Sequence, residues 1–260
     1  MQVRSKFWLW PNIVGIDAAL IAVAWQWIFA TNSQAPLTLS AQLVLGFSVW
    51  LSYMADRLYD VRRRPIEQLL SLRHRFVKSY RKQLWCIWFV ALGLNISIAL
   101  LGLTVEQLRN GSILLAACLL YTFLNQAYSK YFFPKELFVA LIFTAGAVVF
   151  LESLPNHLAV CCFALIGFIN CLIIGHKEQA VDRALRVESL SSVISTKALW
   201  GLIIGACLIL PFIGTIMALS FSLTLLATSL LYRFRRLLTS EVFRTALDAS
   251  MLFGLLPWIF

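Results

Sequence analysis

The chain has 260 residues, of which 60% are hydrophobic and only 13% are charged, and its mean hydropathy is +0.81. Soluble domains carry about 25% charged residues, so this composition excludes an ordinary water-soluble fold and predicts an all-α integral membrane protein. The net charge of +10 would fit nucleic-acid binding in a soluble protein, but here we expect it to set the membrane topology.

The N-terminal stretch "MQVRSKFWLWPNIVGIDAALIAVAWQWIFA" has the basic start and apolar run that a signal peptide also has. The run is long, contains Asp17 and lacks an obvious small-x-small cleavage site, so we interpret it as the first spanning helix. Hydropathy predicts a single transmembrane domain, 1–260, of about nine helices around a central cavity. The predicted spans are residues 11–30, 38–55, 83–103, 111–128, 135–152, 157–175, 198–213, 215–232 and 244–260.

The basic residues predict the orientation of these spans. If the N-terminus is cytoplasmic, 21 of the 22 Lys and Arg residues fall in the tail and loops of the cytoplasmic side, and Arg109 is the exception. The pattern predicts a multi-pass protein of a bacterial inner membrane, with its C-terminus on the opposite side. Because the cations are spread over every inner loop, we do not expect nucleic acid as a partner.

Two acidic pairs follow the second and sixth predicted spans. Asp56 and Asp60 form the first pair, and Glu178 and Asp182 form the second. Residues four apart share a helix face, so each pair presents two carboxylates to one side, where their repulsion favours a bound cation. Mg²⁺ takes oxygen ligands and bridges carboxylates to phosphates. We therefore predict that these four residues bind Mg²⁺.

Four spans separate the two pairs, which suggests pseudo-repeats of roughly 1–133 and 134–260 whose acidic pairs face one another. A third element, "AYSKYFFPKEL", lies on the same side and supplies Tyr128, Lys130 and Lys135. Cations beside carboxylate-bound metal suit a polyanionic ligand such as a diphosphate. We expect a site for such a ligand only if the three elements converge.

The simpler alternative is that the four acidic residues are solvated loop charges paired with neighbouring arginines. Asp17 and Asp248, which lie in or beside apolar segments, are interpreted as helix-packing or interfacial groups. The runs "RRRP" and "RHRFVKSYRK" are interpreted mainly as topology anchors. Arg64 is the exception, because it closely follows the first acidic pair.

The chain resembles the UbiA-type intramembrane prenyltransferases in its layout and in three short stretches. Their first motif reads roughly Asn-Asp-x-x-Asp-x-x-x-Asp and is often followed by Arg-Pro. In "SYMADRLYDVRRRP" the last two aspartates match as Asp56 and Asp60, and Arg64 precedes the proline. The motif's Asn and first Asp fall on Ser52 and Tyr53, so two of its oxygen ligands are replaced here.

The second motif, Arg-Asp-x-x-x-Asp, resembles "KEQAVD", in which Lys177 and Glu178 replace the first two residues and Asp182 is retained. The Tyr-x-x-Lys-like element of the family resembles "YSK", with Tyr128 and Lys130. The resemblance implies that these four acidic residues hold Mg²⁺ and form the catalytic centre. It also implies that Lys130, Lys177, Arg64 and Tyr128 contact the diphosphate.

The implied reaction transfers an isoprenyl group from a prenyl diphosphate to a lipophilic, aromatic acceptor with Mg²⁺ as cofactor. Two alternatives stay open from the sequence. A terpene cyclase would use the same diphosphate site but let the substrate's own double bonds attack the cation, and the altered first motif keeps this reading open. A non-catalytic isoprenoid-binding membrane protein would bind the lipid without turnover.

Overall fold

The structure is a computed structural model that describes residues 6–62, 65–128, 133–153, 155–184 and 190–259. Within these ranges the secondary structure is helical, with no strand. The α-helices are α1 (Trp10–Val14), α2 (Ile16–Asn32), α3 (Leu39–Asp60), α4 (Leu72–Ser79), α5 (Arg81–Gly102), α6 (Val105–Tyr128), α7 (Lys135–Val148), α8 (His157–Ala184), α9 (Leu190–Val193), α10 (Thr196–Ile209), α11 (Thr215–Arg233), α12 (Ser240–Ser250) and α13 (Leu256–Ile259). Short 3₁₀ turns occupy Phe7–Leu9, Ile66–Gln68, Leu210–Phe212 and Met251–Leu255.

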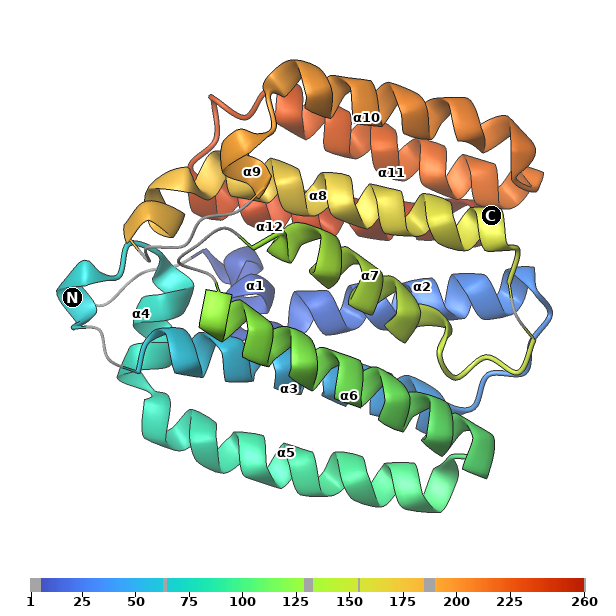
Figure 1. Ribbon diagram of the computed structural model, residues 1–260, viewed down its shortest axis with the longest axis horizontal. Coiled ribbons are helices and arrows are strands. Elements are labelled where there is room, and N and C mark those ends of the chain that lie inside the picture. Colours follow the sequence, from blue (N-terminus) through green and yellow to red (C-terminus); the bar gives the residue numbers. More distant parts are fainter. Residues whose placement is uncertain (1–5, 63–64, 129–132, 154, 185–189, 260) are drawn as a thin grey trace.

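The long helices run roughly alongside one another, and the described chain ends lie at opposite ends of the bundle (Figure 1). α2 packs against α3 and α7, and so connects the two halves of the chain. In the first half α3 packs on α2 and α5, and in the second half α8 packs on α7 and α10. A repeat would produce this packing order, although the pseudo-repeats and the single domain stay predictions.

The surface of the bundle is that of an integral membrane protein. Only 11% of the apolar stretch of α5 is buried, and its outward side chains include Phe89, Leu94 and Leu101. Unpaired apolar surface of this size is stable only in contact with lipid or a partner. The all-helical architecture suits this environment, because a helix satisfies its own backbone hydrogen bonds in hydrocarbon.

The number of spans stays a prediction. Among the described residues, four helices are long and apolar enough to cross a membrane, and a fifth crossing is reached by counting a bent pair as one span. Each of the nine predicted spans falls on a helix or a run of helices. However, α7 and α10 have only 14 residues each, and a helix needs about 20 to cross the hydrocarbon unaided.

The first predicted span, 11–30, is bent rather than continuous. α1 and α2 meet at Gly15 with an angle of 82° between their helical segments. Gly15 has φ +74, a left-handed conformation that glycine adopts without steric cost. The buried Arg57 of α3 donates from Nη1 to the carbonyl oxygens of Asn12 and Ile13, at 2.9 and 3.2 Å. Arg57 thereby adds side-chain hydrogen bonds to the carbonyls at the end of α1.

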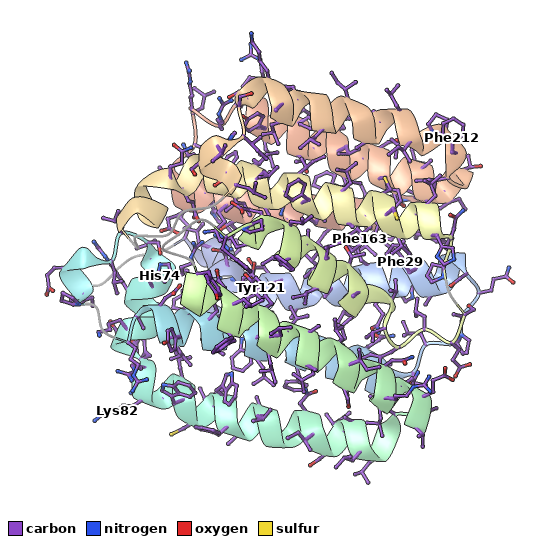
Figure 2. The ribbon with its side chains drawn as sticks, viewed as in Figure 1. Phe29, His74, Lys82, Tyr121, Phe163 and Phe212 are labelled. Carbon is purple, nitrogen blue, oxygen red and sulfur yellow. The ribbon has the colours of Figure 1, made fainter. Side chains whose placement is uncertain are left out.

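The main hydrophobic core lies between α2, α8 and α11. The Trp25 ring is fully buried, 4.4 Å from the Phe163 ring and 5.3 Å from the Phe221 ring between centroids. Figure 2 shows Phe29 and Phe163 side by side in this region, with their ring centroids 5.5 Å apart. The indole N–H of Trp25 donates to the carbonyl of Met251, at 2.9 Å, where α12 ends and the last predicted span breaks into a 3₁₀ turn.

The close packing at Trp25 predicts that Gly254→Ala destabilises the protein. A Cβ at Gly254 would lie 2.6 Å from the Trp25 ring, whereas a Cβ at Gly201 of α10 would meet nothing within 4 Å. Overpacking of this kind costs about 1–3 kcal/mol. We expect a lower melting temperature for Gly254→Ala in detergent and no decrease for the control Gly201→Ala; equal melting temperatures would contradict the packing.

Candidate functional site

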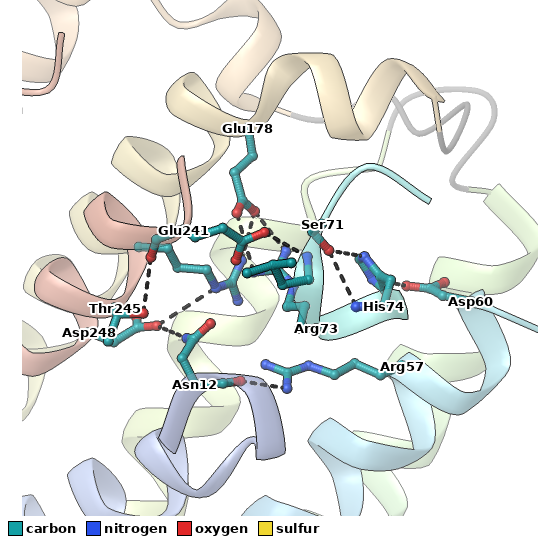
Figure 3. Close-up of polar contacts among 12 residues, drawn as sticks. Asn12, Arg57, Asp60, Ser71, Arg73, His74, Glu178, Glu241, Thr245 and Asp248 are labelled. Carbon is teal, nitrogen blue, oxygen red and sulfur yellow. Dashed lines mark hydrogen bonds and ion pairs between the residues drawn. The ribbon is translucent and has the colours of Figure 1, made fainter. Parts of the chain in front are cut away.

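The two predicted acidic motifs lie at the same end of the bundle and meet at α4. α4 carries Arg73 and His74 as consecutive residues. Arg73 contacts Glu178 of α8, and His74 lies beside Asp60 at the end of α3 (Figure 3). The chain between the second and third predicted spans therefore folds back between the acidic motifs instead of extending away as a solvated loop.

The first acidic pair is accessible. The Asp56 side chain is exposed, and the Asp60 side chain is 32% exposed. Oδ2 of Asp60 lies 3.8 Å from Nε2 of His74. Asp60, Lys135, Arg57 and His74 all lie within electrostatic reach of Asp56. Lys135 begins α7, so the third predicted element contributes positive charge close to the first pair.

Glu178, in contrast, is buried between two arginines. Its Oε1 and Oε2 accept hydrogen bonds from Nη1 and Nη2 of Arg73, at 3.2 and 2.8 Å. Its Oε2 also accepts from Nη1 of Arg244 on α12, at 2.8 Å. Bidentate contacts between arginine and carboxylate are among the stronger hydrogen bonds in proteins. The carboxylate that the sequence predicts as a metal ligand is therefore engaged by two cations.

The charge network continues towards the N-terminus. Nε of Arg244 lies 3.7 Å from Oδ2 of Asp248, which accepts a hydrogen bond from the Asn12 side chain at 2.9 Å. The same Asn12 amide nitrogen donates to Asp17. Asp17 and Asp248, interpreted from the sequence as packing groups, thus join α1, α2 and α12 through one amide.

His74 is held by its own helix cap. The Ser71 hydroxyl oxygen accepts the backbone N–H of His74 and lies 2.6 Å from its Nδ1. Burial, together with the positive charges of the neighbouring Arg73, Arg57 and Arg244, lowers the pKa of His74 to about 3. The imidazole is therefore neutral at physiological pH. The tautomer protonated on Nε2 accepts from Ser71 and directs its N–H towards Asp60.

The other predicted site residues are distributed differently. Lys177 donates from Nζ to the carbonyl oxygens of Arg235 and Leu238, both at 2.8 Å, and so stabilises the chain after α11. Tyr128 ends α6 with an exposed side chain. Lys130 and Arg64 lie outside the described residues. Asp182 lies on α8, but its side chain is outside the described set.

Sequence reasoning missed the two arginines that hold Glu178. Arg73 is part of the run interpreted as topology anchors, and its basic neighbours conceal its role. Arg244 begins the last predicted span and stands four residues before Asp248. The sequence does contain a signal for Arg244. A cation and an anion four residues apart in an apolar segment indicate a buried ion pair, because buried charges need partners.

The carboxylate oxygens of Asp56 and Asp60 fit the ligand preference of magnesium, whereas the surroundings of Glu178 do not. Two accessible carboxylates one helical turn apart are a sufficient protein contribution for Mg²⁺, which completes its shell with phosphate oxygens and water. Glu178 already shares its charge with two guanidinium groups. Among the described residues there is no group of three or more His, Cys, Asp and Glu side chains that could hold a metal ion.

Comparison with known proteins identifies the fold. No known protein family matches the sequence, and no curated protein does. Among solved structures, the chain is similar to the apo structure of a UbiA homolog from Aeropyrum pernix K1, with a TM-score of 0.65 and 18% sequence identity. The similarity covers 94% of this chain and 99% of that chain. The two proteins therefore share an all-helical membrane fold.

The lowered pKa of His74 predicts acid sensitivity. Below pH 6.5 the unfolded chain takes up a proton at this residue, whereas the folded protein does so only near pH 3. Stability from this group is therefore complete above pH 6.5 and is lost as the pH falls, by up to about 1.4 kcal/mol per pH unit.

We expect the melting temperature to fall between pH 7.5 and pH 5, and to fall less steeply in His74→Gln. The control is His157→Gln, which alters an exposed histidine at the start of α8. An identical slope in wild type and His74→Gln would contradict a neutral buried imidazole.

Proposed function

We propose that this chain is a UbiA-type intramembrane prenyltransferase that moves an isoprenyl group from a prenyl diphosphate to a lipophilic, aromatic acceptor. The observation that carries the proposal is the convergence of two acidic helix ends at one end of an apolar bundle. Arg73 and His74 of α4 each contact one acidic motif. The fold shared with a UbiA homolog supports the same assignment.

Magnesium is the proposed cofactor, with Asp56, Asp60 and Asp182 as the residues that would hold it. When bound, it would neutralise the negative charge that develops on the departing diphosphate. Asp56 and Asp60 suit this role because they are accessible and lie one helical turn apart. The presence of Lys135 near Asp56 adds a cation that favours a polyanionic substrate.

The remaining residues act on the substrate through position and exclusion of water. We propose that Lys130 and Arg64 donate hydrogen bonds to the diphosphate as the carbon–oxygen bond breaks and its electron pair leaves with the diphosphate. Tyr128 ends α6 with an exposed side chain. The apolar helices keep water from the allylic cation. A carbon–carbon bond to the acceptor then forms, and the acceptor ring loses a proton.

The substituted first motif favours one second candidate, a terpene cyclase. Tyr53, an aromatic residue, stands where the motif has its first aspartate. An aromatic ring stabilises a nearby cation through its π-face. In a cyclase the same diphosphate would leave, but the new bond would form to a double bond of the substrate itself.

The proposal predicts that Asp56→Asn greatly slows magnesium-dependent turnover. Removing one charged group that acts on the departing diphosphate costs about 10²–10³-fold in rate. The measurement uses purified protein, prenyl diphosphates of several lengths and aromatic acceptors, with products identified by mass spectrometry. The matched control is Glu106→Gln, which alters a 75% exposed carboxylate at the other end of the bundle.

The products separate the candidate functions. Prenylated acceptor formed only with magnesium supports the transferase, and a cyclic hydrocarbon or alcohol formed without acceptor identifies the cyclase. If no donor releases diphosphate and Asp56→Asn binds prenyl diphosphate as tightly as wild type does, the chain is a non-catalytic isoprenoid-binding protein and the proposal is wrong.

A further inference from the structure

We infer that Glu178 is a positioning residue rather than a magnesium ligand, and that Arg73, Glu178 and Arg244 form a metal-free clamp that fixes α4 beside the first acidic pair. The inference deepens the proposed function and rests on it where magnesium is concerned. It changes the expected ligand set, because Asp182 is then the one member of the second acidic motif that stays a proposed metal ligand.

The geometry of the clamp is that of a completed ion-pair cluster. Glu178 accepts three hydrogen bonds from two guanidinium groups, with donor–acceptor distances of 2.8 to 3.2 Å. The three side chains come from α4, α8 and α12, which are far apart in the sequence. Glu178, Arg73 and Arg244 are 7%, 6% and 9% exposed as whole residues, so water does not screen the contacts appreciably.

Charge balance opposes a metal at this carboxylate. Arginine stays protonated in proteins, so Glu178 faces two permanent positive charges. A magnesium ion would approach a ligand oxygen to about 2.1 Å and would meet both guanidinium groups at short range. Binding there would require at least one arginine to leave its partner while buried, which is strongly unfavourable.

The clamp has a consequence for the first acidic pair, because Arg73 and His74 are neighbours on the short helix α4. The N-terminus of α4 is also held by Glu241, which accepts the N–H of Leu72 at 2.7 Å. Lys78, in the last turn, donates to the carbonyl of Val61 at 2.9 Å. With α4 fixed in this way, His74 is held 3.8 Å from Asp60. Glu178 therefore sets the surroundings of a proposed metal ligand from a distance.

The test separates stability without metal from affinity for metal. Thermal unfolding of the purified protein is followed in detergent with EDTA and across a magnesium titration, for wild type, Glu178→Gln and Asp182→Asn. We expect Glu178→Gln to lower the melting temperature in EDTA by roughly 10 °C, because it leaves two buried arginines without their carboxylate. The magnesium concentration at the midpoint of the magnesium-induced shift in melting temperature (the magnesium midpoint) should stay within about twofold of wild type.

Asp182→Asn is the matched control, since it alters a carboxylate one turn further along the same helix. It should raise the magnesium midpoint at least about tenfold, about 1.4 kcal/mol. The inference is overturned if Glu178→Gln raises the midpoint in this way and keeps the wild-type melting temperature in EDTA.

Turnover adds a readout that a purely structural contact would not change. Below the melting temperature, Glu178→Gln should lower kcat without changing the magnesium midpoint, and Glu178→Asp should restore most of the lost kcat because it keeps the negative charge. A Glu178→Asp variant as impaired as Glu178→Gln would contradict a positioning role for the carboxylate.

If Glu178→Gln yields no folded protein, Arg73→Gln tests the clamp instead. In this variant Glu178 keeps Arg244 as a hydrogen-bond partner, so the disruption is smaller. It should lower the melting temperature in EDTA, whereas the control Arg109→Gln at an exposed pair should not. An unchanged melting temperature in Arg73→Gln overturns the clamp. If wild type shows no magnesium-induced shift, the magnesium part of the proposed function fails, while the EDTA measurements still test the clamp.

Discussion

The buried contact of Glu178 with Arg73 and Arg244 is the interaction on which the end of the bundle that carries the two acidic motifs depends. It joins α4, α8 and α12 through one carboxylate. Desolvated charges are unfavourable unless each finds a partner, so the three helices can approach one another only in an arrangement that brings these charges together. The position of α4, and with it that of His74 beside Asp60, follows from this requirement.

The Asp-Arg dipeptide of the first motif illustrates how adjacent charges acquire separate roles. Asp56 is exposed, whereas Arg57 is buried and binds the carbonyls at the end of α1. Successive residues of a helix point about 100° apart, so one side chain can be exposed while the next points into the interior of the bundle. The acidic partner stays available to a ligand because the arginine is engaged by backbone.

The apolar remainder of the chain serves two different purposes. The rings of Trp25, Phe163 and Phe221 fill the interior between α2, α8 and α11, whereas the side chains of α5 cover the exterior. Both sets have the same composition in the sequence, since lipid is as apolar as a protein core. Hydropathy therefore predicts where helices occur and does not predict which of their faces pack together.

The sequence alone determined the membrane class, the positions of the helices and the acidic character of two helix ends. These properties are local sums over short windows, and the predicted span 83–103 accordingly falls on α5 (Arg81–Gly102). The partner of each charge was decided only by tertiary structure. Arg73 and Glu178 are 105 positions apart, and Glu178 and Arg244 are 66 apart. No local pattern specifies such contacts, because they form only when packing brings distant helices together and water no longer screens their charges.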